Sequence, residues 1–247
     1  MDQNPVEFKK IFFHSNRLSN EYKDVPAPEP ASKNTPKWYQ DSDIYIKMPN
    51  GEPARYPDGS RALGYKSCPA ILDLYTTGYV LKTPCDITFE LTGDKISVNL
   101  PMQFKDFCEI RPGGMSDFAI PSGHYESSFH FYPTWAPELP EGYSALYVTP
   151  LNHFELPFTM VAGIIDNDKF NTPGLMPFFL KKEFNGVLPK GTPFVQIIPF
   201  KREDWEMDVK LHNQAEIFER SKWANDTFRI PDGGVYKKSF WTRRKYR

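Results

Sequence analysis

The sequence predicts an all-β protein with a compact barrel or sandwich core, an extended N-terminal arm, and a C-terminal helix followed by a basic tail. Three observations support this fold class. Of 247 residues, 24 are proline, which is poorly tolerated inside helices and central strands. Aromatic residues are frequent (20 Phe, 13 Tyr and 5 Trp), and these suit pleated surfaces. The central part also alternates short apolar runs with turns that contain Gly or Pro, as joined β-strands do.

Composition limits the class of protein further. A hydrophobic content of 40% and a charged content of 25% are ordinary for a soluble globular chain of this length. The three cysteines (Cys68, Cys85 and Cys108) form an odd set without CxxC spacing, which favours a reducing compartment over a disulfide framework. Neither a secretory signal pattern nor an apolar window of membrane-spanning length is present. We therefore expect no membrane association and synthesis in the cytoplasm.

The first 40 residues are predicted to form an extended arm. An apolar and basic patch, FKKIFF at residues 8–13, is followed by VPAPEPAS at 25–32. A segment rich in Pro, Ala and Ser indicates an extended linker. Such a segment is either disordered or becomes ordered against a partner or a neighbouring copy. Trp38 and Tyr39 could anchor its end on the main domain.

Residues 41–202 are predicted to form the β-rich core domain. Its first part contains PNG and PDG, which are turn signals between short extended runs. A hairpin is expected about residues 92–94. Four later runs are apolar, short and bounded by Gly or Pro, and we expect each to contain strands; they cover residues 142–148, 158–165, 176–182 and 193–199.

Residues 203–247 are predicted to form a helical segment and a basic aromatic tail. The stretch at about 208–224 lacks Gly and Pro and carries charges throughout, which favours a helix. The last eleven residues carry six basic groups and no acidic one, although the formal charge of the whole chain is -1. Such a tail suits nucleic acid or an acidic protein surface, and a solvated terminus is the alternative. The expected partner-binding residues are Lys237, Lys238, Trp241, Arg243, Arg244 and Tyr246.

The stretch from Leu139 to Arg202 contains an ordered series of motifs. PEGY at 140–143 is followed by AGIIDND at 162–168 and by PKGTPFVQ at 189–196. This order resembles the central half of the dUTPase and dCTP-deaminase superfamily, in which GxID and GxxxxQ elements build a nucleotide site between β-strands. The resemblance implies a dUTPase-like β-clip as the core.

The same resemblance assigns roles to individual residues. Asp166 matches the Asp of GxID, which acts as a general base on water, so the resemblance makes it the candidate catalytic residue. Asp168 matches the second acid of the IDxD form. Gln196 matches the Gln that helps to complete the site between subunits, and Lys190 precedes that element, so both are candidate ligand-binding residues. Mg²⁺ is implied only if the protein acts on nucleotides; otherwise no cofactor or metal is expected.

Departures from the family pattern weigh against catalysis. The family places an Arg-Ser pair before GxID, and residues 148–153 (VTPLNH) lack it. The Tyr that stacks on the base falls at Lys169, with Phe170 one place late. The Gly-rich C-terminal segment that covers the phosphates is also missing. Because these groups contact phosphate or base, the sequence favours a non-catalytic protein over a nucleotide-binding or nucleotide-hydrolysing one.

A second resemblance covers roughly residues 35–207. Several blocks, among them CPAILDLYTTGYVLKTPCDI and GVLPKGTPFVQIIPFKREDW, are similar to an uncharacterised protein family of tailed bacteriophages and bacteria. This similarity implies a bacteriophage origin, which favours a structural or assembly protein that is made in the host cytoplasm and carried in the virion; a small host-takeover protein is the alternative. Its expected partners are other virion or assembly proteins. By analogy with the mostly trimeric dUTPases we also expect a homo-oligomer.

Two histidine patterns have functional and structural interpretations. In GHYESSFH a strand would place His124 and Glu126 on one face, near enough to share a metal in a cupin-like site. The usual HxH pair is missing, so a plain polar face is the preferred interpretation. His153 could form a His-Asp pair with Asp166, but a lone His in a Pro-bounded loop is more often structural.

Overall fold

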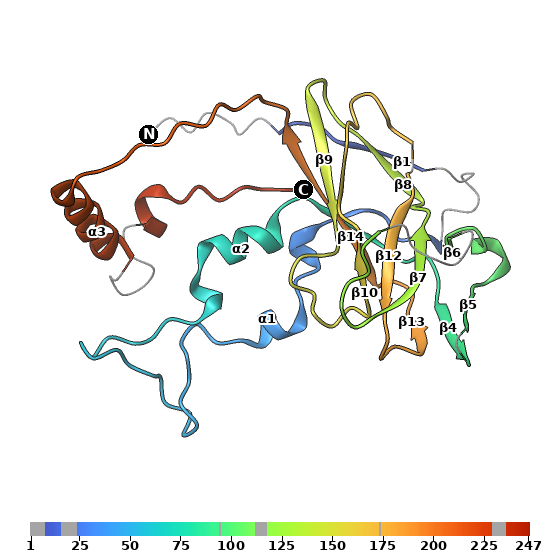
Figure 1. The fold of residues 1–247 in the computed structure, drawn as a ribbon, viewed down its shortest axis with the longest axis horizontal. Coiled ribbons are helices and arrows are strands. Elements are labelled where there is room, and N and C mark those ends of the chain that lie inside the picture. Colours follow the sequence, from blue (N-terminus) through green and yellow to red (C-terminus); the bar gives the residue numbers. More distant parts are fainter. Residues whose placement is uncertain (1–7, 16–23, 94, 112–117, 173, 229–235) are drawn as a thin grey trace. The chain divides into compact units, whose positions relative to one another are not determined.

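The computed structural model describes residues 8–15, 24–93, 95–111, 118–172, 174–228 and 236–247 (Figure 1). The chain divides into two compact units. The β unit comprises Met1–Ala31 and Gly78–Arg202, and the helical unit comprises Ser32–Thr77 and Glu203–Arg247. The structure thus groups residues 32–77 with the C-terminal region, a grouping that the three zones expected from the sequence do not contain.

The described part of the chain is mostly β-structure, as the sequence predicts. Each of the four predicted runs contains strands, and the expected hairpin is formed by β4 and β5, where Thr92 pairs with Lys95. The strands are β1 (Phe12–Ser15), β2 (Glu29–Pro30), β3 (Tyr79–Lys82), β4 (Ile87–Thr92), β5 (Lys95–Asn99), β6 (Cys108–Ile110), β7 (His124–Phe131), β8 (Trp135–Glu138), β9 (Tyr143–Val148), β10 (Phe158–Met160), β11 (Gly163–Ile165), β12 (Met176–Lys181), β13 (Gly186–Leu188) and β14 (Pro193–Lys201).

The strands of the β unit pair in an antiparallel manner into several sheets. The largest has the order β11-β9-β14-β3-β2, and a second has the order β10-β12-β7-β6. Smaller sheets have the orders β13-β4-β5 and β1-β8. Strands β10 and β11 are separated by only two residues but belong to different sheets, so the chain changes sheet at this point.

The core of the β unit is rich in phenylalanine rings. Phe131 on β7 stacks on Phe178 of β12 at a centroid distance of 4.1 Å. It also lies 5.0 Å from Phe194 of β14, which links the four-stranded sheet to the five-stranded one. All three side chains are almost fully buried. The high aromatic content of the sequence therefore fills the space between two sheets, where ring contacts add to the effect of area burial.

The N-terminal segment differs from the predicted linker. Val25 and Ala31 are buried, and β2 pairs with β3 at the edge of the five-stranded sheet. The indole nitrogen of Trp135 also donates a hydrogen bond of 2.9 Å to the carbonyl of Pro26. Residues 25–31 are therefore ordered against the chain itself, an outcome that neither expected alternative (disorder, or ordering against a partner or a neighbouring copy) describes. The physical reason is that an edge strand tolerates proline and that β3 needs a partner on that side.

The helical unit contains α1 (Lys37–Asp41), α2 (Pro69–Thr76) and α3 (Gln214–Phe228). No helix of the described residues is both long and apolar enough to cross a membrane. Helix α3 begins later than the predicted position 208, because Asn213 and Glu216 form a capping box. The Asn213 side chain accepts from the Glu216 amide, and the Glu216 carboxylate accepts from the Asn213 amide, both at 3.0 Å. Residues 208–213 therefore lie outside the helix.

The two predicted turns of the helical unit are confirmed. Gly51 and Gly59 both have positive φ, and their amides donate to the carbonyls of Met48 and Tyr56. Only glycine adopts this backbone conformation at little cost, which explains the PNG and PDG sequences. Isolated bridges, among them Tyr45 with Leu63, join the short extended legs on either side of these turns.

Candidate functional site

Asp166 and Asp168, the two acids that match the dUTPase-like motif, lie where three strands of the five-stranded sheet end. Ile165 of β11 pairs with Ala145 of β9, so Asp166 comes level with Ser144. The Ser144 hydroxyl donates a hydrogen bond of 2.6 Å to Asp166 Oδ1. Ser144 in turn pairs with Phe200 of β14, whose strand ends just before Arg202. We call the group of Ser144, Asp166, Asp168 and Arg202 the clasp.

Arg202 is the centre of the clasp. Its guanidinium forms a two-pronged ion pair with Asp168, in which Nη1 donates to Oδ1 at 2.8 Å and Nη2 donates to Oδ2. Nη1 also lies 3.0 Å from the Ser144 hydroxyl and from the Tyr143 carbonyl, and donates to both. This fork geometry is one that Arg supplies and Lys does not. The three strand ends are therefore joined through one side chain.

Asp168 is a structural acid in this arrangement. Its side chain is only 3% exposed, and the Gly142 amide donates to its Oδ2 at 2.9 Å. The hydrogen bonds from Arg202 hold the pKa of the Asp168 carboxyl well below its usual range, although burial opposes this shift. The same hydrogen bonds raise the pKa of Arg202. Both groups therefore remain charged at neutral pH and neutralise each other.

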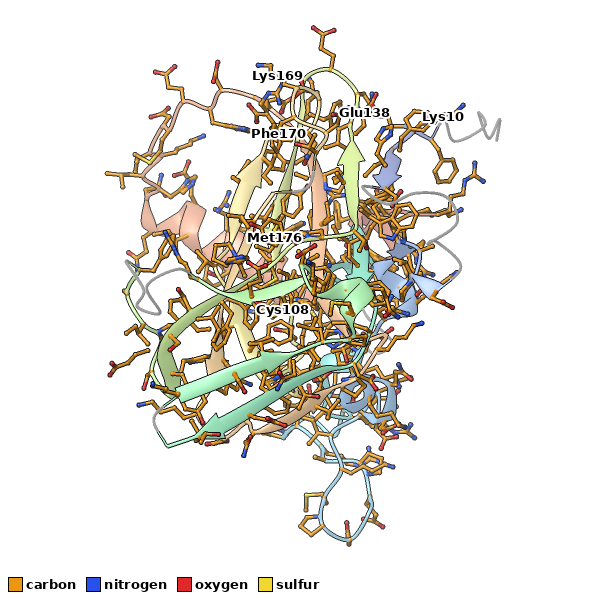
Figure 2. The ribbon with its side chains drawn as sticks, turned by 90° about the vertical axis from the view of Figure 1, so that its right-hand side faces the viewer. Lys10, Cys108, Glu138, Lys169, Phe170 and Met176 are labelled. Carbon is orange, nitrogen blue, oxygen red and sulfur yellow. The ribbon has the colours of Figure 1, made fainter. Side chains whose placement is uncertain are left out.

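Asp166 is placed differently from Asp168. Its side chain is 48% exposed, and its Oδ1 lies 3.3 Å from Arg202 Nη1. It therefore borders the clasp and also faces solvent. Figure 2 shows the next two residues after the acids, Lys169 and Phe170, near Glu138 at one end of the β unit. This agrees with the hydrogen bond of 3.3 Å that Asn171 donates to Glu138.

The structure does not bring Gln196 and Lys190 to Asp166. Gln196 is buried, and its Oε1 accepts a hydrogen bond of 3.0 Å from the Leu151 amide. It lies four residues before Phe200 on β14, two strands from β11, so strand dimensions place it about 16 Å from Asp166. Lys190 lies in the turn before β14, where its amide donates to Asp86. A site that combines all three residues therefore needs a second copy of the chain.

The two candidate histidines, His124 and His153, have structural partners. His153 Nδ1 lies 2.7 Å from Glu155, and His153 follows the end of β9 opposite to the end that meets Asp166, so no His-Asp pair forms. Both ring nitrogens of His124 are engaged, by the Ser122 carbonyl and the Thr159 hydroxyl. Across the described ranges, no group of three His, Cys, Asp or Glu side chains has an arrangement that could hold a metal ion.

One of the three cysteines, Cys108, is buried in the β unit. Cys108 (labelled in Figure 2) lies on β6 within the phenylalanine-rich core of the β unit. Burial raises the pKa of its thiol well above the usual value. A thiol of this kind is neutral and packs like a small apolar side chain.

Two aromatic residues of the basic tail are engaged within the helical unit. The indole nitrogen of Trp241 donates a hydrogen bond of 2.9 Å to Asp73 of α2. Tyr246 is partly buried, which raises the pKa of its hydroxyl, and it makes a hydrogen bond with Thr77 at the end of α2. These two predicted anchors therefore contact the chain itself, because α2 offers them polar partners.

The cations of the tail remain on the outside. Lys237, Lys238, Arg243, Arg244 and Lys245 are exposed, and none of them forms an ion pair with another described residue. We call these five residues the basic strip. Since Trp241 and Tyr246 fix the chain on α2, the strip is held in place and is not a loose end.

A further surface was not anticipated from the sequence. Among the described residues of the helical unit, three hydrophobic side chains are buried (Tyr39, Ala62 and Tyr75), whereas fourteen large ones are exposed. The exposed ones are Trp38, Ile44, Ile46, Met48, Tyr56, Tyr65, Trp205, Met207, Val209, Leu211, Ile217, Phe218, Trp223 and Phe240. The apolar surface of this unit is therefore mostly presented to solvent.

Sequence reasoning also missed Ser144 and Arg202. Asp166 and Asp168 were recognised from a motif, but their partners lie 22 and 34 residues away along the chain. The strand patterns at 142–148 and 193–199 could have indicated them. If these two runs are paired as neighbouring antiparallel strands, Ser144 and Arg202 come to the same end of the sheet.

Comparison with known proteins does not add an assignment. No protein-family model matches the chain, and no curated protein matches it significantly.

Proposed function

We propose that this chain is a non-catalytic interaction protein, a bacteriophage structural or assembly component that uses its β fold as a platform for contacts with other proteins. The observation that carries the proposal is the surface of the helical unit, which exposes fourteen large hydrophobic side chains and buries three hydrophobic ones. Large apolar side chains exposed in such number favour an interaction surface over the surface of an isolated protein. The bacteriophage assignment rests on the sequence similarity over residues 35–207.

The clasp supports a structural role for the motif acids. In the dUTPase-like β-clip that we propose for the β unit, Asp166 and Asp168 would face a nucleotide. Here Asp168 is buried against Arg202, and Asp166 accepts a hydrogen bond from Ser144. Paired, hydrogen-bonded charges at a meeting point of strands fix the ends of those strands. The acids therefore serve the fold of the β unit.

The basic strip gives the helical unit a second kind of contact. Five exposed cations, held on α2 by Trp241 and Tyr246, suit an acidic surface on a virion or assembly protein. A nucleic acid would be bound through the same cations. In that case, retention on DNA would fall steeply with salt and would be lost when the five residues are replaced by glutamine.

A nucleotide-binding or nucleotide-hydrolysing protein is the alternative, and one observation favours it. The Asp166 carboxylate is half-exposed and lies beside the Arg202 guanidinium, so an acid and a cation meet at the surface. In that alternative Asp166 would activate water and Mg²⁺ would accompany the substrate phosphates. The strong pairing of Arg202 with Asp168 argues against it, since the cation is already neutralised.

A panel of deoxynucleoside triphosphates with Mg²⁺ separates the two functions. Thermal shift and product formation are measured for the wild type, for Asp166→Asn, and for Glu141→Gln, an exposed acid in the neighbouring turn, as the matched control. We expect no nucleotide-specific shift and no product in any of the three. A specific shift or turnover that Asp166→Asn abolishes and Glu141→Gln retains would overturn the non-catalytic function.

A further inference from the structure

The segment that joins β14 to α3 has the side-chain pattern of a strand but belongs to no sheet of the described residues. Figure 1 draws residues 203–211 as an extended trace without helix. We call this segment the arm; it is a different segment from the N-terminal arm expected at residues 1–40. Its sequence, EDWEMDVKL, alternates apolar and charged residues. On an extended chain Trp205, Met207, Val209 and Leu211 lie on one side, and Glu206, Asp208 and Lys210 on the other.

The apolar side of the arm is almost fully in water. Trp205 and Met207 are each 87% exposed, Val209 is 68% exposed and Leu211 is 88% exposed. Period-two alternation is typical of a strand with one buried face. Among the described residues of the helical unit none covers these four side chains, so we expect a surface from outside this unit to cover them. The arm is therefore a candidate docking element.

A matching surface is present on the β unit of the same protein. The register places Ile164 of β11, Leu146 of β9 and Ile198 of β14 in one row across the sheet. The alternate residues Ala145 and Ile197 are buried in the core, so the row lies on the outer face.

The outer face carries apolar side chains that remain in contact with solvent. Ile164 is 63% exposed, Phe200 in the neighbouring row is also exposed, and Leu146 and Ile198 are half-buried. We call these four residues the outer strip. The arm from Trp205 to Leu211 spans about 20 Å when extended, and a six-residue strand such as β9 has a similar length. The arm can therefore lie along the strands of this face.

We propose that the arm of one copy docks on the outer strip of a second copy, and that two copies exchange arms reciprocally. This inference rests on the proposed interaction function and names its partner. Four side chains of this size cover roughly 500 Å², and an equal area is covered on the acceptor. One such contact reaches about 1,000 Å², the lower limit for a specific interface, whereas a reciprocal exchange reaches about 2,000 Å². The area favours two copies over a one-sided contact.

The first test is the oligomeric state of the full chain. Sedimentation is measured from submicromolar to high micromolar concentration for the wild type and for the triple variant Trp205→Ser, Met207→Ser and Leu211→Ser. We expect a wild-type dimer or closed oligomer and a dissociation constant raised at least about a hundredfold in the variant. The matched control, Glu206→Gln, Asp208→Asn and Lys210→Gln, changes the opposite side of the arm and should leave the constant within about threefold.

Circular dichroism of each variant shows that the β unit is still folded. A wild type that is monomeric over the whole range overturns the proposal. So does an oligomer that the triple variant leaves intact.

A disulfide test identifies the acceptor. Chains with Val209→Cys and chains with Ile164→Cys carry different tags, both in a Cys68→Ser background, and are produced together. We expect an oxidised product that joins the two tags, and none when Val187→Cys, an exposed position on β13, replaces Ile164→Cys.

Other outcomes of these tests would overturn the exchange of arms or the proposed function. A third chain carries both Val209→Cys and Ile164→Cys. A disulfide that forms only within this chain, and not between the two tagged chains, would show that the arm folds back on its own β unit, and it would overturn the exchange. A monomer with a silent nucleotide panel would remove the second copy as partner and leave the non-catalytic function standing. Nucleotide turnover would instead remove the function itself.

Discussion

The β unit and the helical unit use their apolar residues in opposite ways. Among the described residues, the β unit buries 28 hydrophobic side chains and exposes twelve large ones, whereas the helical unit buries three and exposes fourteen. Burial of apolar area is the main favourable contribution to folding. We infer that the stability of the protein resides in the phenylalanine core of the β unit, and that the apolar surface of the helical unit is available for contacts with partners.

The largest effect is expected from a substitution in the core. Phe131→Ala removes a fully buried ring that contacts Phe178 and Phe194, so it should lower the free energy of unfolding by about 3–5 kcal/mol. The matched control is Phe218→Ala on α3, where the ring is exposed and the change should cost less than about 0.5 kcal/mol. Chemical denaturation measures both. Equal losses would show that the two units do not differ in this way.

A smaller loss is expected from breaking the clasp. Arg202→Met leaves the buried carboxylate of Asp168 without its cation, which should destabilise the β unit, whereas Lys190→Met in an exposed turn should be neutral. Thermal unfolding compares the two variants. If Arg202→Met melts like Lys190→Met, the clasp does not contribute to the stability of the sheet.

The pH dependence of stability gives the clasp a signature of its own. The pKa of Asp168 is lowered in the folded state, so its contribution is fully present above the unfolded pKa of about 4 and is lost as the pH falls toward the folded pKa. The wild type should therefore lose stability below about pH 4 more steeply than Arg202→Met does. Parallel curves for the two proteins would contradict the ion pair. Denaturation at a series of acidic pH values measures this difference.

The helix cap should have a local effect. Asn213→Ala removes the side-chain acceptor of the capping box and should destabilise α3 by about 1 kcal/mol, with little change in the β unit. Hydrogen exchange should become faster in the first turn of α3 only. Asn225→Ala, an exposed change inside the same helix, is the control. A loss of protection in the core strands would indicate that α3 contributes to the global fold.

An effect of similar size, also local, is expected at the anchor of the basic strip. Trp241→Phe keeps the ring but removes the hydrogen bond to Asp73, which should cost about 1 kcal/mol and raise the local opening of residues 236–247 about fivefold. Proteolysis near the basic strip measures this opening, with Thr242→Val as the exposed control. Unchanged proteolysis in Trp241→Phe would mean that the hydrogen bond does not fix the strip.

Local sequence signals predicted the parts of the fold that depend on local interactions. The strand runs, the hairpin at Thr92 and the turns at Gly51 and Gly59 follow from alternation and from residues that favour turns. The pairing of residues 29–30 with β3 could not be predicted in this way, because it joins segments some 50 residues apart. Proline-rich composition alone does not distinguish an edge strand from a linker.

The candidate site shows the same limit. The motif identified Asp166 and Asp168, but the role of each depends on Arg202, which reaches them only after β14 has paired with β9. The start of α3 could have been predicted from the sequence, since Asn213 and Glu216 have capping-box spacing. The helix was predicted from position 208 because charged residues occur throughout that stretch. Val209 and Leu211 alternate with those charges, and this alternation is typical of a strand.

Hydrogen exchange of the full chain at a series of protein concentrations tests the difference between the two units most directly. We expect the β7 amides from Phe129 to Phe131 to be protected equally at every concentration, because they lie in the core of a single chain. Protection of the arm, residues 203–211, should instead rise with concentration as its apolar side is covered by a second copy. An arm that exchanges at the same rate at all concentrations would contradict the account.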